Sequence, residues 1–348
     1  MVQTAITLRR CERCQHEWFP RKVGPPKKCP RCQAPYQLRA ARTTVNGDAH
    51  AEISALATRI RQHVLRMVFE ASSGHIGGSL SATDIMSVLY TRVLQHDAAR
   101  PDWSQRDRFI LSKGHCTPVQ YALLAELGYF PVEELDTFRR AGTRLQGHSV
   151  LGEPPGVDNS AGSLGMGLSF GLGIRLAARL QDLDFHVYVL MGDGEQEEGQ
   201  VWEAAMAASH HGVERLVAIV DRNGIQNDDF TARTMSNEPL DEKYRAFGWA
   251  VRSDVDGHDP GAIEEALLWA RDVRERPACV IFDTVKGKGI SFMEHNPAFH
   301  GAPPTPEQYE EAMRELAHGA AQGGAAQDRA RPNGSGSDGR QGDGATAP

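Results

Sequence analysis

The chain has 348 residues, enough for one large or two ordinary domains with a substantial core, and a net charge of −7. It contains no apolar run of about 18 residues and no secretory leader at the N-terminus, so we expect a cytoplasmic protein with no membrane partner. Six cysteines, four of them clustered near the N-terminus, do not form the pattern of a disulfide scaffold.

The first 40 residues differ from the rest in charge and cysteine content. They carry nine Lys and Arg against two acidic residues, a net charge of +7, which leaves −14 for the remainder. Two Cys-x2-Cys pairs lie 14 residues apart, a spacing that suits tetrahedral Zn²⁺ with no open position for catalysis. We therefore predict a zinc ribbon at residues 1–40, folded by structural Zn²⁺ on Cys11, Cys14, Cys29 and Cys32.

The charge of the predicted ribbon suggests that it has its own partner. A basic surface suits an acidic protein, and we hold this as a hypothesis. Nucleic acid is the alternative, but Trp18, Phe19 and Tyr36 are better interpreted as the ribbon's own core than as a base-stacking platform. We therefore do not expect nucleic acid as the partner.

Three Gly-His pairs follow in the next hundred residues. After a linker at 41–49, apolar residues recur at helical spacing over 51–71, and His75 follows in a glycine-rich loop. His115 comes directly after a short predicted strand, and His148 lies in a third loop. A histidine between loop glycines is difficult to interpret as a core residue. We treat the three as candidate functional residues, with an ordinary loop position as the alternative.

The middle of the chain contains two buried strands that end in polar residues. One strand ends at Gly192-Asp193-Gly194, and the next ends just before Asn223. Parallel strands bring such residues to one edge of a sheet, where open α/β sheets bind ligands. One carboxylate and one amide are too few to enclose Mg²⁺, which shares its coordination with phosphates, so the pattern indicates a phosphorylated ligand. The two flanking glycines allow close approach of diphosphate oxygens.

The region after Asn223 completes the predicted fold. Strands at 249–255 and 278–285 flank a helix at 262–273, and the β-α-β-α-β order predicts an α/β fold with a parallel sheet covered on both faces. A helix at 306–316 ends the domain, which we place at 41–318. Residues 319–348 lack apolar periodicity, and we expect a disordered tail.

Taken together, these motifs resemble a known family. The 28 residues between Gly194 and Asn223 match the spacing of the thiamine diphosphate motif. With the three Gly-His loops, the chain resembles the N-terminal, diphosphate-binding domain of transketolase over roughly residues 50–318, and it is most similar to the stand-alone N-terminal subunits of split transketolases. The matching segments include SSGHIGGSLS, RDRFILSKGHC, LQGHS, GDGEQEEGQVWEA, DRNGIQND and TVKGKGISFMEHNPAFHGAPP.

The resemblance implies a role for several residues. Mg²⁺ (or Ca²⁺) would lie on Asp193, Asn223 and the carbonyl of Ile225. Glu198 and Glu203 would couple paired active sites, and Glu198 is also implied among the cofactor-binding residues. Residues implied at the diphosphate are Gly192, Gly194, Asn223, His115 and His300, and those at the aminopyrimidine are Gly162, Ser163 and Leu164. His75, His148 and His300 would line the channel for the sugar, and the implied catalytic residues are these three and His115.

The resemblance also implies the activity and a partner. Such a chain transfers a two-carbon ketol unit from a ketose, or ketose phosphate, to an acceptor. It works with a C-terminal subunit that carries the pyrimidine-binding domain, as an α2β2 heterotetramer. The alternatives are a subunit of another thiamine enzyme, similar to deoxyxylulose-phosphate synthase or a 2-oxo-acid dehydrogenase, and a non-catalytic zinc-ribbon scaffold. The ketose donor and the acceptor stay open.

Overall fold

The computed structural model describes residues 9–10, 17–18, 47–227 and 229–328, and the chain divides into two compact units, 1–47 and 48–348. In the first unit, β1 (Arg9–Arg10) and β2 (Glu17–Trp18) pair antiparallel. The four cysteines of the predicted zinc ribbon lie outside the described residues.

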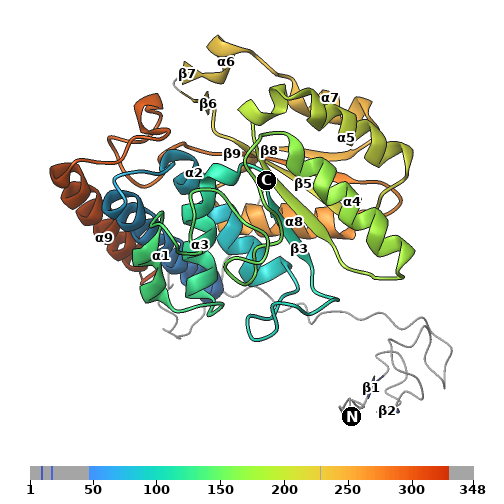
Figure 1. Ribbon diagram of the computed structural model, residues 1–348, viewed down its shortest axis with the longest axis horizontal. Coiled ribbons are helices and arrows are strands. Elements are labelled where there is room, and N and C mark those ends of the chain that lie inside the picture. The colour runs from blue at the N-terminus through green and yellow to red at the C-terminus, as the bar shows by residue number, and fades with distance from the viewer. Residues whose placement is uncertain (1–8, 11–16, 19–46, 228, 329–348) are drawn as a thin grey trace, which may run out of the picture. The chain divides into compact units, whose positions relative to one another are not determined.

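A five-stranded sheet forms the centre of the second unit (Figure 1). Its strands, in spatial order, are β3 (Arg108–Leu111), β4 (Val187–Gly192), β5 (Leu216–Arg222), β9 (Ala278–Asp283) and β8 (Ala250–Asp256). All four neighbouring pairs are parallel, which confirms the predicted α/β fold. Because β4 pairs directly with β5, with Gly192 opposite Asp221, the polar ends of these two strands lie side by side.

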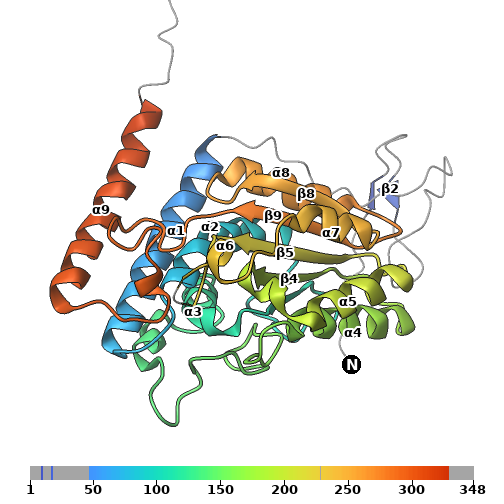
Figure 2. The same ribbon diagram turned by 90° about the horizontal axis from the view of Figure 1, so that it is seen from above.

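Helices cover both faces of this sheet (Figures 1 and 2). One core includes residues of α1 (Gly47–Glu70), α2 (Gly77–Val88), α3 (Thr117–Glu126) and α8 (Pro260–Asp272). The other core includes residues of α4 (Met166–Leu180), α5 (Gly199–His210) and α7 (Leu240–Ala246). Shorter elements near the strand ends are α6 (Thr231–Thr234), β6 (Ile225–Gln226), β7 (Asp229–Phe230) and the 3-10 turns Gly114–Cys116, Gly194–Glu197 and Pro297–Phe299.

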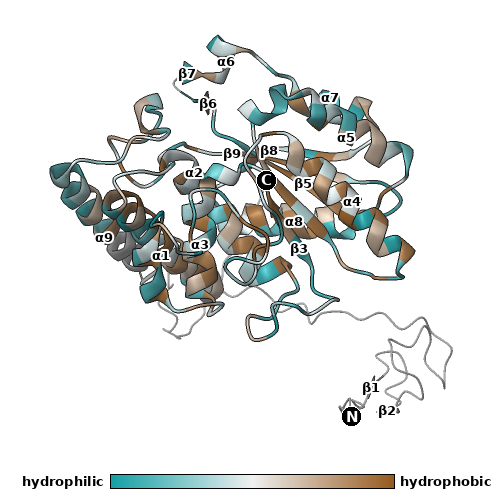
Figure 3. Ribbon diagram, in the orientation of Figure 1, coloured by the Kyte–Doolittle hydropathy of each residue, from teal (hydrophilic) through white to brown (hydrophobic). Residues whose placement is uncertain are grey.

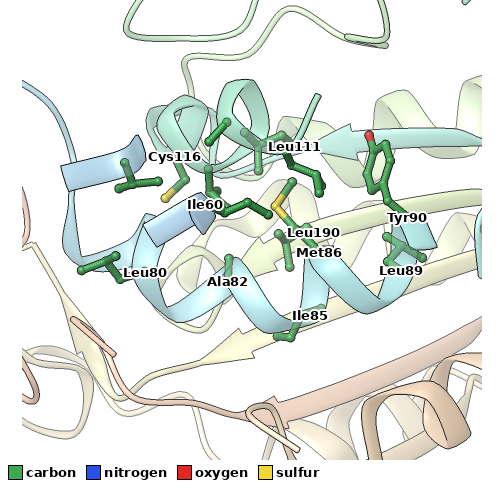
Figure 4. Packing of buried hydrophobic residues seen from close by; sticks show 14 of the residues in the cluster. Ile60, Leu80, Ala82, Ile85, Met86, Leu89, Tyr90, Leu111, Cys116 and Leu190 are labelled. Atoms are coloured by element: carbon green, nitrogen blue, oxygen red, sulfur yellow. The ribbon is translucent and has the colours of Figure 1, made fainter. Parts of the chain in front are cut away.

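The alternation of side chains along β4 shows why the strands are hydrophobic throughout. Tyr188 and Leu190 belong to the first core, whereas Val187, Val189 and Met191 belong to the second. Both faces of each central strand are therefore buried, as in other covered parallel sheets, and Figure 3 shows these strands in the hydrophobic colour. Figure 4 shows side chains of α2 packed in the first core with residues of β3 and β4.

The last helix is longer than the sequence indicated. We predicted a helix over 306–316 and a disordered tail from 319, but α9 runs over Pro306–Asp328. Residues 319–328 include four alanines and two glutamines, good helix formers whose propensity favours continuing an established helix despite three glycines. Residues 329–348 lie outside the described part. Within the described residues, no helix has the length and hydropathy needed to cross a membrane.

Candidate functional site

The predicted metal ligands lie together at the carboxyl ends of β4 and β5. Asp193 and Asn223 are buried, at 3 % and 8 % exposure, and follow β4 and β5 directly. Oδ2 of Asp193 accepts a hydrogen bond from the Gly224 amide at 2.8 Å, and Oδ1 of Asn223 accepts one from the Ile225 amide at 3.2 Å. The segment that carries Asn223 and Ile225 is thus tied to Asp193, which gives one carboxylate, one amide and one carbonyl in a single neighbourhood.

Among the residues that the structure describes, no basic side chain forms an ion pair with Asp193. Burial and the nearby Asp221 carboxylate raise the pKa of Asp193 to about 6, although backbone amides of Gly224 and Gly194 act in the opposite direction. A buried carboxylate of this kind gains free energy when a cation arrives beside it. The described residues contain no group of three or more His, Cys, Asp or Glu side chains suited to a metal, so a cation here would depend on the mixed oxygen set.

Lys286 is a further residue of the site to which the sequence analysis assigned no role. Its Nζ donates to the Ile225 carbonyl at 2.9 Å and to Nδ1 of His300 at 2.7 Å. Burial, followed by the charge of Lys113, lowers the pKa of Lys286 to about 8. Its position after β9, at the same sheet edge as Asp193, was the signal that could have revealed it.

The four predicted catalytic histidines form one group, which we call the histidine cluster (His75, His115, His148 and His300). The ring centroid of His75 lies 4.9 Å from that of His115, 5.2 Å from that of His300 and 6.3 Å from that of His148. The cluster draws on loops before α2, after β3, before α4 and after β9. Gly77 allows this convergence, because a Cβ there would lie 2.8 Å from the Phe299 carbonyl oxygen.

The environment keeps the histidine cluster uncharged. Burial, followed by the charge of Arg139, lowers the pKa of His75 to about 4, and burial, followed by Lys286, lowers that of His300 to about 3. Burial, followed by Lys113, lowers the pKa of His115 well below its ordinary value. Burial, followed by Arg139, also lowers that of His148. All four rings are therefore neutral near pH 7, when each has one donor and one acceptor nitrogen.

A second polar group lies against the predicted ligands, and we call it the anchor cluster (Ser81, Lys113, Asp221 and Thr284). Asp221 accepts hydrogen bonds from Lys113 Nζ, Ser81 Oγ and Thr284 Oγ1, and Lys113 also donates to the Gly78 carbonyl at 3.0 Å. Burial acts to raise the pKa of Asp221, but the Lys113 ammonium and the two hydroxyls outweigh it, so the pKa is lowered. These contacts join α2, the end of β3, β5 and the end of β9.

The other predicted cofactor residues divide into two groups. Gly192 and Gly194 lie beside Asp193, and a Cβ on Gly194 would lie 2.6 Å from Cβ of Gln226, so the close packing requires glycine. Gly162 and Ser163 line a cavity of about 540 Å³ with exposed Met166 and Phe170, and Leu164 is half-buried beside them.

Glu198 occupies a different position from these residues. It and Glu203 are exposed on α5, with Glu198 at the N-cap and its Cβ facing Gly165. The carboxylate that ties β4 to this region is Glu195, which accepts hydrogen bonds from the amides of Gly165 at 2.9 Å and Gly192 at 3.1 Å. Sequence reasoning missed Glu195 because the acidic run around it is typical of a solvated helix face.

The chain is similar in sequence to transketolases. The family described as "Transketolase, thiamine diphosphate binding domain" matches residues 53–322. The 6-deoxy-6-sulfo-D-fructose transketolase subunit SqwG of Clostridium sp. (strain MSTE9) is 42 % identical over 260 residues, which cover 75 % of this chain and 94 % of the relative. An apulose-4-phosphate transketolase subunit of Phocaeicola vulgatus is 40 % identical over 256 residues, which cover 74 % and 90 %.

Solved structures show the same fold in longer proteins. Transketolase from Leishmania mexicana superposes with a TM-score of 0.70 at 30 % identity, over 80 % of this chain and 46 % of that protein. Transketolase from Campylobacter jejuni gives a TM-score of 0.69 at 27 % identity, over 82 % and 49 %. The chain therefore spans about half the length of these proteins, whereas it matches the two subunits above over nearly their full length.

Proposed function

Because the chain belongs to the transketolase family and contains its thiamine diphosphate-binding domain, we propose that it is the N-terminal subunit of a split transketolase. It would transfer a two-carbon ketol unit from a ketose, or ketose phosphate, to an acceptor. The main support for the proposal is that Asp193, a buried carboxylate with a raised pKa that would be stabilised by a cation, and a neutral histidine cluster lie at one sheet edge. Its relatives named as subunits support the division into two polypeptides.

The residues at the strand ends fit Mg²⁺, or Ca²⁺ in its place. Asp193, Asn223 and the Ile225 carbonyl offer hard oxygen ligands, and their small number suits an ion that shares its shell with phosphate oxygens. Asp193 supports this fit because its buried carboxylate forms no ion pair with a basic side chain within the described residues. Bound Mg²⁺ would neutralise part of the charge of a diphosphate.

Lys286 and the neighbouring histidines fit the diphosphate itself. Lys286 Nζ lies between the Ile225 carbonyl and His300, so it brings a positive charge to the metal ligands from the side of the histidine cluster. His115 and His300 are neutral and can donate hydrogen bonds to phosphate oxygens, and Gly192 and Gly194 leave the backbone accessible. Thiamine diphosphate, when bound, supplies the carbon nucleophile that attacks the ketose carbonyl.

The histidine cluster fits the handling of the sugar. A neutral imidazole can hydrogen-bond a sugar hydroxyl and either take up or return a proton, whereas an imidazolium can only donate. His148 is exposed and His75 and His300 are half-buried, so the cluster reaches from the predicted diphosphate site towards solvent. We assign these three histidines to the sugar channel.

We propose that the reactive end of the cofactor lies at an interface with a pyrimidine-domain subunit. The cavity lined by Gly162 and Ser163 carries exposed Met166 and Phe170, 51 % and 45 % exposed, which suits coverage by a second polypeptide. In this arrangement, a two-fold symmetric α2β2 assembly would complete each site. Glu198 and Glu203, exposed on α5, would then act across the subunit interface rather than at the diphosphate.

Activity of the separate and combined subunits tests the proposal. The full chain alone, with thiamine diphosphate, Mg²⁺ and a ketose phosphate, should show no ketol transfer. Addition of the pyrimidine-domain subunit from the same organism should produce ketol transfer to an aldose. Robust turnover by the pure single chain would contradict the split arrangement, and no turnover by the combined subunits over a panel of ketose donors would contradict the activity.

We also propose that residues 1–40 bind one structural Zn²⁺ through Cys11, Cys14, Cys29 and Cys32. The spacing of the four cysteines supports this, and metal analysis of protein purified without chelator should give one zinc per chain. Cys29→Ser should release the metal and leave the 41–318 domain folded. A chain free of zinc would refute the ribbon, and a pull-down of an acidic protein that is insensitive to deletion of residues 1–40 would refute its docking role.

A further inference from the structure

Arg139 precedes His148 in the same connection before α4, and its side chain reaches the loop that carries His75. We propose that Arg139 is a positioning residue that fixes the position of His75 relative to His148 at the entrance of the sugar channel. The inference rests on the proposed function, in which these histidines handle the sugar.

Hydrogen bonds from Arg139 reach both histidine loops. Its Nη1 donates to Ser73 Oγ at 2.5 Å, two residues before His75. Its backbone amide donates to the Leu145 carbonyl at 2.8 Å, three residues before His148. One residue therefore links the segment before α2 to the segment that ends at His148, although the two are far apart in the chain.

The guanidinium of Arg139 is closely packed against the loop that carries His148. A Cβ on Gly147, the neighbour of His148, would lie 2.5 Å from Nε and Nη2 of Arg139, so a larger residue there would displace the guanidinium from this position. The preceding residue, Phe138, lies against the other loop, where a Cβ on Gly74 would be 3.3 Å from its Cε1 atom. Arg139 itself has a φ of 58°, a left-handed conformation that costs free energy for a residue with a side chain.

The half-buried Arg139 is balanced differently from three other arginines that are buried or half-buried. Arg61, Arg106 and Arg271 each form an ion pair with an aspartate. No acidic side chain among the described residues forms an ion pair with Arg139, so its charge acts on the two imidazoles beside it. After burial, it is the largest cause that lowers the pKa of His75 and of His148.

Other groups also face the imidazoles of His75 and His148, and they contribute to the pKa values that a variant of Arg139 would change. His75 is faced by His148, Lys286 and the rings of His115 and His300, in addition to Arg139. His148 is faced by Arg139 and His75. None of these groups is a carboxylate, so removal of Arg139 should move both titrations in the same direction, upwards.

Histidine NMR on the full chain, with labelled histidines, tests the electrostatic side of this role without any need for activity. In Arg139→Met, the pKa of His75 and of His148 should rise relative to the wild type, whereas in Arg139→Lys, which retains the charge, both should stay low. Arg140→Met removes the same charge from an exposed neighbour and should change neither titration. Unchanged titrations in Arg139→Met, or equal shifts in Arg140→Met, would overturn the proposal.

Kinetics of the assembled enzyme test the placement. Arg139→Met and Arg139→Lys should both lower kcat/KM for the ketose, by about 10- to 100-fold, because neither side chain reproduces the planar guanidinium that donates to Ser73 Oγ and packs against Gly147. The acid limb of the pH profile should move to higher pH in Arg139→Met only. Full activity in both variants would overturn the positioning role, whereas absence of ketol transfer in the wild-type assembly would overturn the proposed function and leave the NMR result to decide on Arg139.

Discussion

The anchor cluster and the histidine cluster lie close together at the same sheet edge, but they balance charge in different ways. In the anchor cluster, Lys113 and Asp221 are almost fully buried, and each pairs with the other and with further hydrogen-bond partners. The histidine cluster is faced by Lys286, Lys113 and Arg139, and within the described residues no carboxylate pairs with any of its four rings.

This difference in charge balance indicates that the anchor cluster stabilises the fold, whereas the surroundings of the histidine cluster suit a ligand. A closed, fully paired charge cluster leaves nothing for a ligand to satisfy, and its contribution is to join α2, β3, β5 and β9 at fixed positions. A cationic surround without carboxylates favours an anion, and the nearby Asp193 favours a cation. Together these two preferences fit a metal diphosphate. Substitutions in the first cluster should therefore affect stability, and substitutions around the second should affect binding.

The largest expected effect is on stability and comes from Asp221→Ala. The change would leave the Lys113 ammonium buried without its partner, which costs about 3–5 kcal/mol of unfolding free energy. Urea denaturation of the full chain measures this. Glu265→Ala, which breaks the exposed pair with Arg252, is the matched control and should change stability by less than about 1 kcal/mol.

A double variant sharpens this test. Adding Lys113→Met to Asp221→Ala removes the unpaired charge and should recover part of the lost stability, because the remaining site is then neutral. A double variant less stable than Asp221→Ala alone would show that the unpaired lysine is not the cause.

In contrast to Asp221→Ala, Asp193→Ala should weaken cofactor binding strongly and change the stability of the fold little. Thiamine diphosphate affinity in the presence of Mg²⁺ should fall by about 100-fold or more, because one metal ligand is lost. Stability of the ligand-free chain should be little changed or raised, since the folded state disfavours this carboxylate, with its pKa near 6. Calorimetry on the assembled enzyme, with and without chelator, measures the first effect. Unchanged affinity would remove Asp193 from the metal site.

A smaller effect is expected from Lys286→Met. Loss of one charged hydrogen-bond donor should weaken thiamine diphosphate binding by about 1.5–3 kcal/mol, which corresponds to at least a tenfold change. Lys288→Met is the matched control, since Lys288 lies two residues further on and faces Glu294 at 3.6 Å. Equal losses of affinity in the two variants would indicate a general charge effect rather than a contact at the site.

The comparison also shows what the sequence could predict. The parallel sheet and the meeting of Asp193 with Asn223 were predictable, because hydrophobic runs of strand length identify buried parallel strands and their polar ends share an edge. The four histidines were assigned catalytic roles through the family resemblance, and the structure brings their rings together.

Residues that act through tertiary contacts were not predictable from local pattern. Glu195 lies in an acidic run typical of a surface, and its burial depends on the loop at Gly165, 30 residues earlier. Asp221 continues a hydrophobic strand, and its partner Lys113 lies 108 residues away. Glu198 was placed among the cofactor residues through the resemblance, and the structure leaves it exposed at the N-cap of α5.

The smallest expected effect is a loss of stability in acid that comes from the histidine cluster. The folded state lowers the pKa of His75 from 6.5 to about 4 and that of His300 to about 3. Below about pH 6.5 the unfolded chain therefore binds protons that the folded chain does not, so stability falls as the pH decreases towards these lowered values. Because both rings are partly exposed, we expect a loss of at most about 1 kcal/mol between pH 6.5 and 5.

Thermal unfolding of the full chain at these two pH values measures the loss, and the double variant His75→Asn and His300→Asn should show a smaller pH dependence. Inorganic diphosphate with Mg²⁺ should stabilise the wild type against heat at pH 7 more than it stabilises Asp193→Ala, because only the wild type retains the full set of metal ligands. An equal pH dependence in the double variant would assign the acid sensitivity to other groups, and it would remove the contrast between the two clusters.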